Sequence, residues 1–262
     1  MLELNDNDKK RKTLTLMTHV VVGYPSLQES EEIVCAMVEA GVSLVELQIP
    51  FSDPMADGPT IMKANEHALS LGVTTEDCFL FAERLSKRVS VPLLFMSYYN
   101  KLFSYRGGIE AFLKRAKQSG ITGLIVPDIP PEETSDGYWT LSKKHGITPV
   151  PIVSPVSDSS RLKRISKIAT SGFVYCVSTT GTTGARTELP KELKSYLTQM
   201  RKVFKVPLAL GFGISTPEHI QAIGKHADIA VIGSATIDLI EKTPKQERIS
   251  KVKEFISSMV NA

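Results

Sequence analysis

The sequence predicts a single-domain (β/α)8 TIM barrel, because short apolar runs of strand-forming residues alternate along the chain with longer amphipathic runs. No second compositional regime and no low-complexity linker interrupts this series. A length of 262 residues is also ordinary for one α/β barrel. We therefore expect one domain over residues 1–262, in which residues 1–14 form a polar N-terminal lead-in.

Eight apolar runs have the length and composition of strands. In chain order they are 17–22 (MTHVVV), 43–49 (SLVELQI), 92–97 (PLLFMS), 122–126 (TGLIV), 148–153 (TPVPIV), 172–177 (GFVYCV), 207–210 (PLAL) and 228–232 (DIAVI). A helical pattern follows each of them. An open doubly wound sheet is the alternative, and it is disfavoured because no Gly-x-Gly-x-x-Gly motif follows the first run.

The helical runs carry their own start signals. Ser26 and Glu29 form a capping-box pattern ahead of the first helical run, and Ser215 and Glu218 repeat this pattern late in the chain. The last helical run, at about 245–260, is expected to complete the outer ring of helices.

The composition argues against several classes of protein. The net charge of +3, from 31 basic and 28 acidic residues, is too balanced to indicate nucleic-acid binding. No apolar run is long enough to cross a membrane, and no signal-peptide segment is visible. The three cysteines, Cys35, Cys78 and Cys176, are isolated, which predicts reduced thiols in a cytoplasmic protein.

A carboxylate inside an apolar strand is the most informative feature of the chain. Strand alternation puts Leu44, Glu46 and Gln48 on one face of the run 43–49, and only apolar residues on the other. The apolar face suits packing against helices, so Glu46 points into the protein interior. A buried, unpaired carboxylate is costly, and a chain accepts it mainly where a proton has to be moved. The alternative is a glutamate that simply reaches water at the strand end.

Asp57 lies in the loop just beyond this strand. Glu46 and Asp57 are thus two carboxylates suited to general acid–base catalysis. No run contains Lys or Arg, which disfavours a Schiff-base aldolase, and no cluster has metal-ligand spacing, so no metal site is expected. His19 is the only histidine in a strand run, and a lone histidine is more often structural than catalytic.

Glycine-bearing turns end three consecutive strand runs. Glycine lets backbone N–H groups approach a ligand closely, and the start of a helix adds its positive dipole end. In barrels, phosphate binds typically at the loops after strands seven and eight. We therefore expect a phosphate or phosphoester site at these three glycine turns, with Thr183 and Ser234 as hydroxyl donors.

Several motifs resemble those of a known family. Pro50-Phe51-Ser52-Asp53-Pro54, followed by Ala56-Asp57-Gly58-Pro59, is similar to the signature of the tryptophan synthase alpha chain. The resemblance covers nearly the whole chain. It includes Gly23-Tyr24-Pro25, Tyr98-Tyr99-Asn100, Pro127-Asp128, Thr183-Gly184, Gly211-Phe212-Gly213 and Gly233-Ser234-Ala235.

The resemblance implies a metal-free lyase that cleaves indole-3-glycerol phosphate to indole and glyceraldehyde 3-phosphate. In that family pattern Glu46 is the general acid–base and Asp57 holds the indole N–H. The family works with a beta chain that carries pyridoxal phosphate, usually as an alpha-beta-beta-alpha tetramer, and passes indole to it. No cofactor is therefore expected in this chain. The implied substrate contacts are Tyr175, Thr183, Gly184, Gly213, Gly233 and Ser234, with Thr183 also helping to close the site and hold Asp57. Phe212, between the two glycines of its turn, and Gln48, on the face of Glu46, are further candidate substrate contacts.

Three residues depart from the family pattern near the indole half of the substrate. Gln48 stands where Gly is usual, His19 where an aromatic or apolar residue is common, and Thr182 where Val is usual. We expect Gln48 to narrow the indole end of the pocket. An active lyase and a catalytically impaired chain that mainly activates its beta chain both remain open. A phosphoribosyl isomerase is less favoured, because runs 17–22 and 148–153 lack the aspartates that such enzymes often pair.

Overall fold

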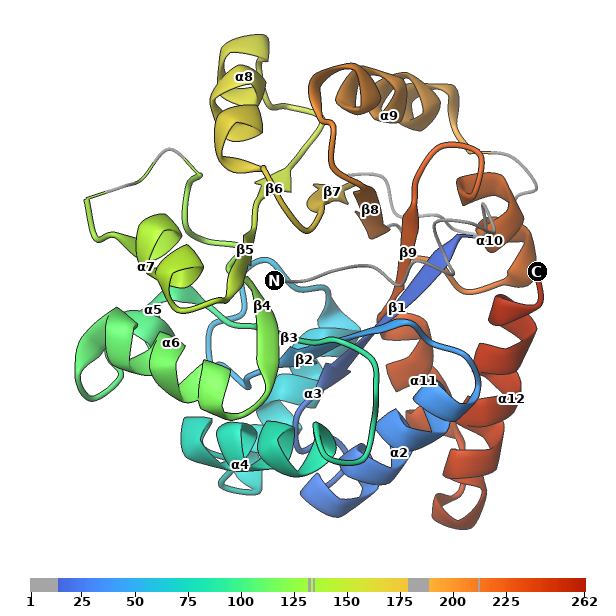
Figure 1. Ribbon diagram of the computed structural model, residues 1–262. Helices are drawn as coiled ribbons and strands as arrows, with labels where there is room; N and C mark the ends of the chain where they lie inside the picture. Colours follow the sequence, from blue (N-terminus) through green and yellow to red (C-terminus); the bar gives the residue numbers. More distant parts are fainter. Residues whose placement is uncertain (1–13, 132, 134, 179–188, 212) are drawn as a thin grey trace.

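The computed structural model describes residues 14–131, 133, 135–178, 189–211 and 213–262 (Figure 1). The predicted lead-in 1–14 therefore lies outside the described residues except for Leu14. Within the described residues the strands form one parallel sheet, in the order β5-β4-β3-β2-β1-β9-β8-β7-β6. Their bounds are β1 (Thr15–Val21), β2 (Leu44–Gln48), β3 (Leu93–Met96), β4 (Ile121–Ile125), β5 (Thr148–Val150), β6 (Ile152–Val153), β7 (Val174–Val177), β8 (Leu208–Gly211) and β9 (Ile229–Ile232).

The two ends of this order are neighbours in the chain. β5 and β6 are the two halves of the predicted run 148–153, and they are divided at Pro151, which has no N–H for a strand ladder. The first half, β5, bonds to β4, and the second half, β6, bonds to β7. The sheet therefore closes on itself through one strand, and the predicted (β/α)8 barrel is confirmed (Figure 1).

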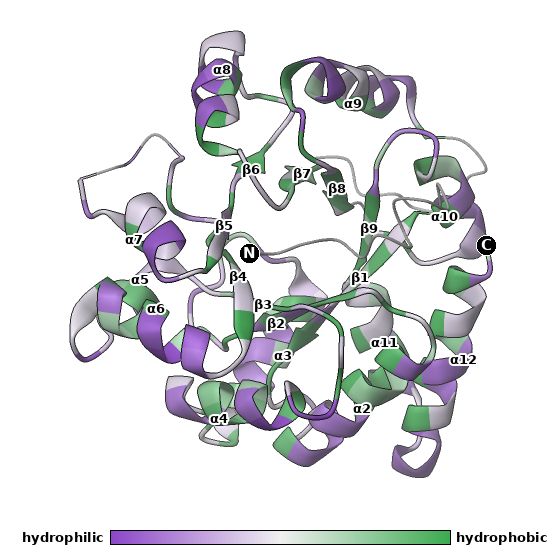
Figure 2. Cartoon of the chain, in the orientation of Figure 1, coloured by the Kyte–Doolittle hydropathy of each residue, from purple (hydrophilic) through white to green (hydrophobic). Residues whose placement is uncertain are grey.

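Helices surround the sheet on the outside (Figure 1). They present hydrophilic residues outwards, while the strands are mostly hydrophobic (Figure 2). Among the described residues, no helix combines the length and the apolar character that crossing a membrane requires. The helix bounds are α2 (Leu27–Glu39), α3 (Pro59–Ser70), α4 (Thr75–Leu85), α5 (Tyr99–Phe103), α6 (Gly108–Gln118), α7 (Tyr138–Lys144), α8 (Ser159–Ile168), α9 (Lys191–Val203), α10 (Pro217–Ile223), α11 (Ser234–Lys242), η1 (Lys245–Glu247) and α12 (Arg248–Val260).

The helix starts confirm one sequence prediction and correct another. Ser26 caps α2, and its hydroxyl accepts the N–H of Glu29. The prediction that Ser215 caps the late helix is wrong by one residue, because Thr216 is the cap. Pro217 fixes the first helical residue of α10, so the preceding residue takes the capping position. The predicted run 245–260 is confirmed as η1 and α12, and α12 packs against α2 and α11.

Strand alternation separates two apolar layers. Leu44 packs inside the barrel with Met17, Leu94 and other residues that point to the axis. Val45 and Leu47 point outwards and pack with the helices. The predicted faces of β2 are thereby confirmed, and Glu46 lies on the inward face.

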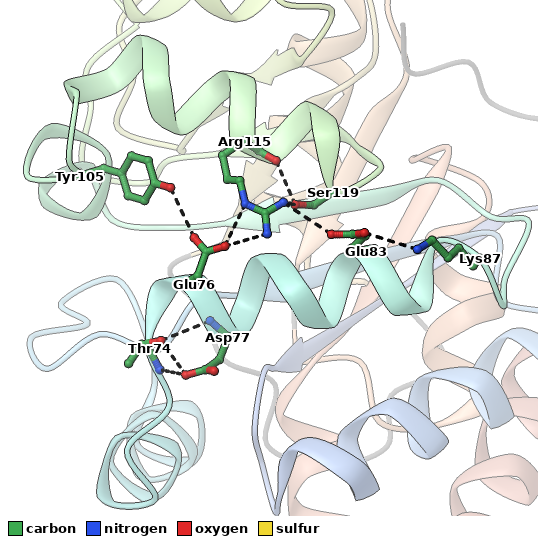
Figure 3. A network of polar contacts seen from close by, with 8 residues as sticks. All are labelled: Thr74, Glu76, Asp77, Glu83, Lys87, Tyr105, Arg115 and Ser119. Carbon is green, nitrogen blue, oxygen red and sulfur yellow. Dashed lines mark hydrogen bonds and ion pairs between the residues drawn. The ribbon is translucent and has the colours of Figure 1, made fainter.

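Polar contacts tie α4 to α6 on the outside of the barrel (Figure 3). The Arg115 guanidinium lies 2.7 Å from the Glu76 carboxylate and 3.7 Å from that of Glu83. A capping box starts α4: the Thr74 hydroxyl accepts the N–H of Asp77 at 3.2 Å, and the Asp77 carboxylate accepts the N–H of Thr74 at 2.9 Å.

Replacing Thr74 by Ala is expected to lower the free energy of unfolding by about 1 kcal/mol, the usual contribution of an N-cap side chain. The N–H of Asp77 then loses its side-chain acceptor. Chemical denaturation of the two proteins measures the difference. Thr74→Ser keeps the hydroxyl and should stay close to the unmodified protein, whereas equal stability of all three proteins would contradict the role of the cap.

Candidate active site

A cavity of about 260 Å³ opens at the carboxyl ends of the strands. This is the end of a barrel at which the loops after the strands build active sites. The structure brings most of the sequence-predicted site residues together here. The walls include Glu46, Asp57, Tyr175, Gly213, Gly233 and Ser234.

Glu46 projects from β2 into this cavity. Its side chain is only 3% exposed, so the alternative that it reaches water at the strand end is wrong. Oε1 lies 3.3 Å from Nδ1 of His19, and Oε2 is buried without a hydrogen-bond partner among the described residues. A buried carboxylate oxygen without a partner is costly to maintain, which is typical of a functional group, and Glu46 lines the cavity.

Asp57 stands in the loop between β2 and α3. Its Oδ2 accepts hydrogen bonds from Nε2 of Gln48 at 2.6 Å and from the Tyr98 hydroxyl at 3.1 Å. The same hydroxyl accepts the N–H of Ala56 at 3.0 Å, which holds the loop in place. Burial raises the pKa of the Asp57 carboxyl above its ordinary value, while His19 and the two hydrogen bonds oppose this shift.

Gln48 lies on the same face of β2 as Glu46, as the sequence predicts, and its amide is bonded within the protein. Its side chain is fully buried and does not line the cavity. The amide instead bonds to Asp57 and, at 2.8 Å, to Nε2 of His19. The amide is thus bonded to Asp57 and His19, and the expectation that Gln48 narrows the indole end stays a prediction.

Sequence reasoning placed His19 near the indole half of the substrate but missed its contacts with Glu46 and Gln48, and it missed the contact of Tyr98 with Asp57. The parallel register of β1 and β2 pairs His19 with Glu46, so the imidazole lies in the cavity wall. An aromatic residue after β3 fixes the Asp57 loop, as Tyr98 stacks on Phe51 with ring centroids 5.0 Å apart. The sequence signal for the contact of His19 with Glu46 was a polar residue in the strand next to the one that carries Glu46.

Tyr175 contributes a partly buried phenol from β7. Burial raises its pKa well above the ordinary value, so the hydroxyl stays protonated and can donate a hydrogen bond. Gly211 on β8 makes room for it, because a Cβ at this position would lie 2.7 Å from the Tyr175 hydroxyl.

Another part of the cavity wall, formed by the turns after β8 and β9, is suited to an anion. Gly213 has φ +64°, a conformation that favours glycine, and Gly233 and Ser234 lead into the N-terminus of α11. Among the described lining residues, which include no Lys or Arg, the Ser234 hydroxyl and backbone N–H groups at the start of α11 can donate to an anion. Thr182, Thr183, Gly184 and Phe212 lie outside the described residues.

No group of three or more His, Cys, Asp or Glu side chains within the described ranges could hold a metal ion. The polar side chains of the described cavity wall include the carboxylates of Glu46 and Asp57, the His19 imidazole and the Tyr175 phenol.

A model of the tryptophan synthase alpha chain family matches residues 5–262. The chain belongs to this family. It is 45% identical over 260 residues to the tryptophan synthase alpha chain of Syntrophotalea carbinolica, covering 99% of this chain and 100% of that one. It is 44% identical to the alpha chain of Desulfotalea psychrophila, with 96% of each chain covered.

Solved structures of alpha chains share the fold. The crystal structure of the alpha chain from Legionella pneumophila superposes with a TM-score of 0.87 at 29% identity, covering 98% of this chain and 94% of that one. A chain from the tryptophan synthase α2β2 complex of Pyrococcus furiosus gives a TM-score of 0.87 at 33% identity, with 95% and 98% covered. The resemblance stated from the motifs is thus confirmed as family membership.

Proposed function

We propose that this chain cleaves indole-3-glycerol phosphate to indole and glyceraldehyde 3-phosphate, as the alpha subunit of tryptophan synthase. One observation carries the proposal. A single cavity is lined by Glu46, whose Oε2 has no hydrogen-bond partner among the described residues, by Asp57, and by the glycine turns and helix start at Gly213, Gly233 and Ser234. These three features match the carbon to be protonated, the indole N–H and the phosphate of the substrate.

The proton transfers balance with Glu46 alone. Glu46 gives a proton to C3 of the indole, which forms a C–H bond and a cationic ring. It then takes the proton of the side-chain hydroxyl as the C–C bond breaks and the aldehyde forms, so Glu46 ends the cycle as it began. Asp57 accepts the indole N–H and stabilises the cationic ring by its charge. Tyr175 lines the site beside Glu46.

The proposed partner is a tryptophan synthase beta chain in an alpha-beta-beta-alpha tetramer, to which indole passes. Pyridoxal phosphate then belongs to that partner, and this chain needs no cofactor of its own. The loop after β2 supports a partner surface, since Met55 is 93% exposed in it. We place the protein in the cytoplasm, which suits its free cysteines.

The impaired-chain alternative gains no support. Its main ground was a Gln48 side chain inside the pocket, and this side chain does not line the cavity. Measuring indole release from indole-3-glycerol phosphate, with and without the cognate beta chain, tests the proposal. We expect release at an ordinary enzymatic rate of ~1 s⁻¹ or above in the complex. Stimulation of the beta reaction without indole release would favour the activator instead.

Replacing Gly213 by Val is expected to weaken binding of glycerol 3-phosphate by roughly tenfold, because a β-branched residue at positive φ distorts the turn that presents its N–H groups. Calorimetric titration of the full chain measures this. Gly72→Val is the matched control, since Gly72 has φ +77° in a turn that does not line the cavity. Equal affinity in both variants and the unmodified chain would contradict a phosphate site at this wall.

A further inference from the structure

A continuous line of hydrogen-bonding groups joins the two carboxylates of the cavity. Glu46 Oε1 lies 3.3 Å from His19 Nδ1, and His19 Nε2 lies 2.8 Å from Gln48 Oε1. Gln48 Nε2 lies 2.6 Å from Asp57 Oδ2. His19, Glu46 and Gln48 are all buried, so each polar atom depends on these neighbours for its hydrogen bonds.

The chemistry of these groups fixes which atoms carry hydrogen. The Asp57 carboxylate only accepts, so Gln48 must present its NH2 group to it. The Gln48 oxygen then faces His19, which requires a hydrogen on Nε2 of the ring. The imidazole can therefore gain or lose a proton only at Nδ1, the atom that faces Glu46.

The surroundings of the ring favour a proton at this contact. Burial alone lowers the pKa of His19, but the carboxylates of Glu46 and Asp57 oppose it, and the balance raises this pKa above the ordinary value. β2 and the loop after it supply these facing groups. On the other side of the His19 ring lies Gly233, in the turn after β9, and this residue has no titratable side chain that could shift the pKa of His19.

We infer that His19 is a positioning residue for Glu46: it shares one proton with the catalytic carboxylate through Nδ1, in a tautomer that Gln48 and Asp57 fix. The effect on turnover rests on the proposed function, whereas the shared proton and the tautomer do not. The family signature residues Glu46 and Asp57 are thereby joined in one acid–base unit.

The proton count of the proposed reaction stays balanced. The shared proton goes to C3 of the indole, and an equivalent proton returns from the side-chain hydroxyl. Between these steps a bare Nδ1 faces the Glu46 anion, so no hydrogen bond from the ring stabilises the anion. Glu46 is then a stronger base at the stage at which it has to take the hydroxyl proton.

Nitrogen-15 NMR of the full chain, labelled at its five histidines, tests the inference directly. His19→Phe identifies the His19 signals. In the unmodified chain we expect the Nε2–H tautomer and a pKa above that of a solvated imidazole. Glu46→Gln is expected to lower the pKa of His19, because burial then acts without the neighbouring charge.

Two further variants separate the tautomer from the charge. Gln48→Met keeps the side-chain length but removes the amide, and Asp57→Asn removes the acceptor-only partner, so both should lose the Nε2–H preference. Because Asp57 lies in a loop, we expect Asp57→Asn to fold, so the tautomer can still be tested if Gln48→Met does not fold. His145, whose Nε2 lies 2.8 Å from Glu110 outside the cavity, is the internal control and should not change. An Nδ1–H tautomer in the unmodified chain, or a His19 signal unaffected by all three variants, would overturn the inference.

Indole release then reports on the function separately. We expect kcat of Gln48→Met to fall roughly tenfold, with an altered pH profile, because Glu46 loses the oriented ring. No release by the unmodified chain, together with a responsive His19, would refute the proposed function alone. Ordinary release with an unresponsive His19 would refute the positioning role alone.

Discussion

Replacing Glu46 by Gln is expected to lower the rate of indole release by at least about 100-fold, the usual contribution of a positioned general acid–base. The amide keeps the size of the side chain but cannot exchange a proton with C3 or with the hydroxyl. Both proton transfers of the proposed reaction are assigned to Glu46, whose Oε2 has no hydrogen-bond partner in the described part of the chain. Steady-state kcat of the complex with its beta chain measures the loss.

The control for this variant is substrate-like binding. Glycerol 3-phosphate should bind Glu46→Gln as it binds the unmodified chain, because the glycine turn at Gly213 is unchanged. Glu110→Gln removes a carboxylate on the outer surface and should keep full turnover. If Glu46→Gln released indole at the unmodified rate, the assignment of the acid–base would fail.

Replacing Asp57 by Asn is expected to reduce kcat by a similar factor of at least ~100, for two reasons. The cationic ring loses the neighbouring charge that stabilises it. Gln48 also loses the carboxylate that orients its amide at 2.6 Å, which disturbs His19. Binding of glycerol 3-phosphate should again survive. A variant with ordinary kcat would show that the indole N–H needs no charged acceptor here.

The raised pKa of Asp57 predicts in which direction turnover changes with pH. Burial raises this pKa, so the carboxylate is lost on acidification at a higher pH than a solvated aspartate would be. Turnover of the unmodified chain should therefore fall as the pH drops through this raised value. The residual activity of Asp57→Asn should lack that step, since Asn does not titrate.

The strands could be predicted from the sequence because each is a short apolar run, and the period of two placed Glu46 on the inner face of β2. The cap at Thr216 was missed by one residue, since Ser215 and Thr216 are both good capping residues and Pro217 decides between them. Local patterns resolve elements better than boundaries for this physical reason.

The connection between the carboxylates could not be predicted in the same way. It depends on the register of β1 against β2, which pairs His19 with Glu46 and Val21 with Gln48. Packing of whole strands sets this register, and no local motif reports it. Of the expected anion-binding residues, Gly213, Gly233 and Ser234 line the cavity, and their roles remain predictions.

The division of the fifth strand at Pro151 has a consequence for the width of the cavity. After Pro151, the described chain shows β6 hydrogen-bonded along one edge only, to β7. Ile152 of this segment lines the cavity. A wall segment held along a single edge can shift outwards while the ladders of the other strands stay intact. We therefore expect the cavity wall to shift more readily at Ile152 than at β1 and β2, which carry His19 and Glu46 and are bonded along both edges.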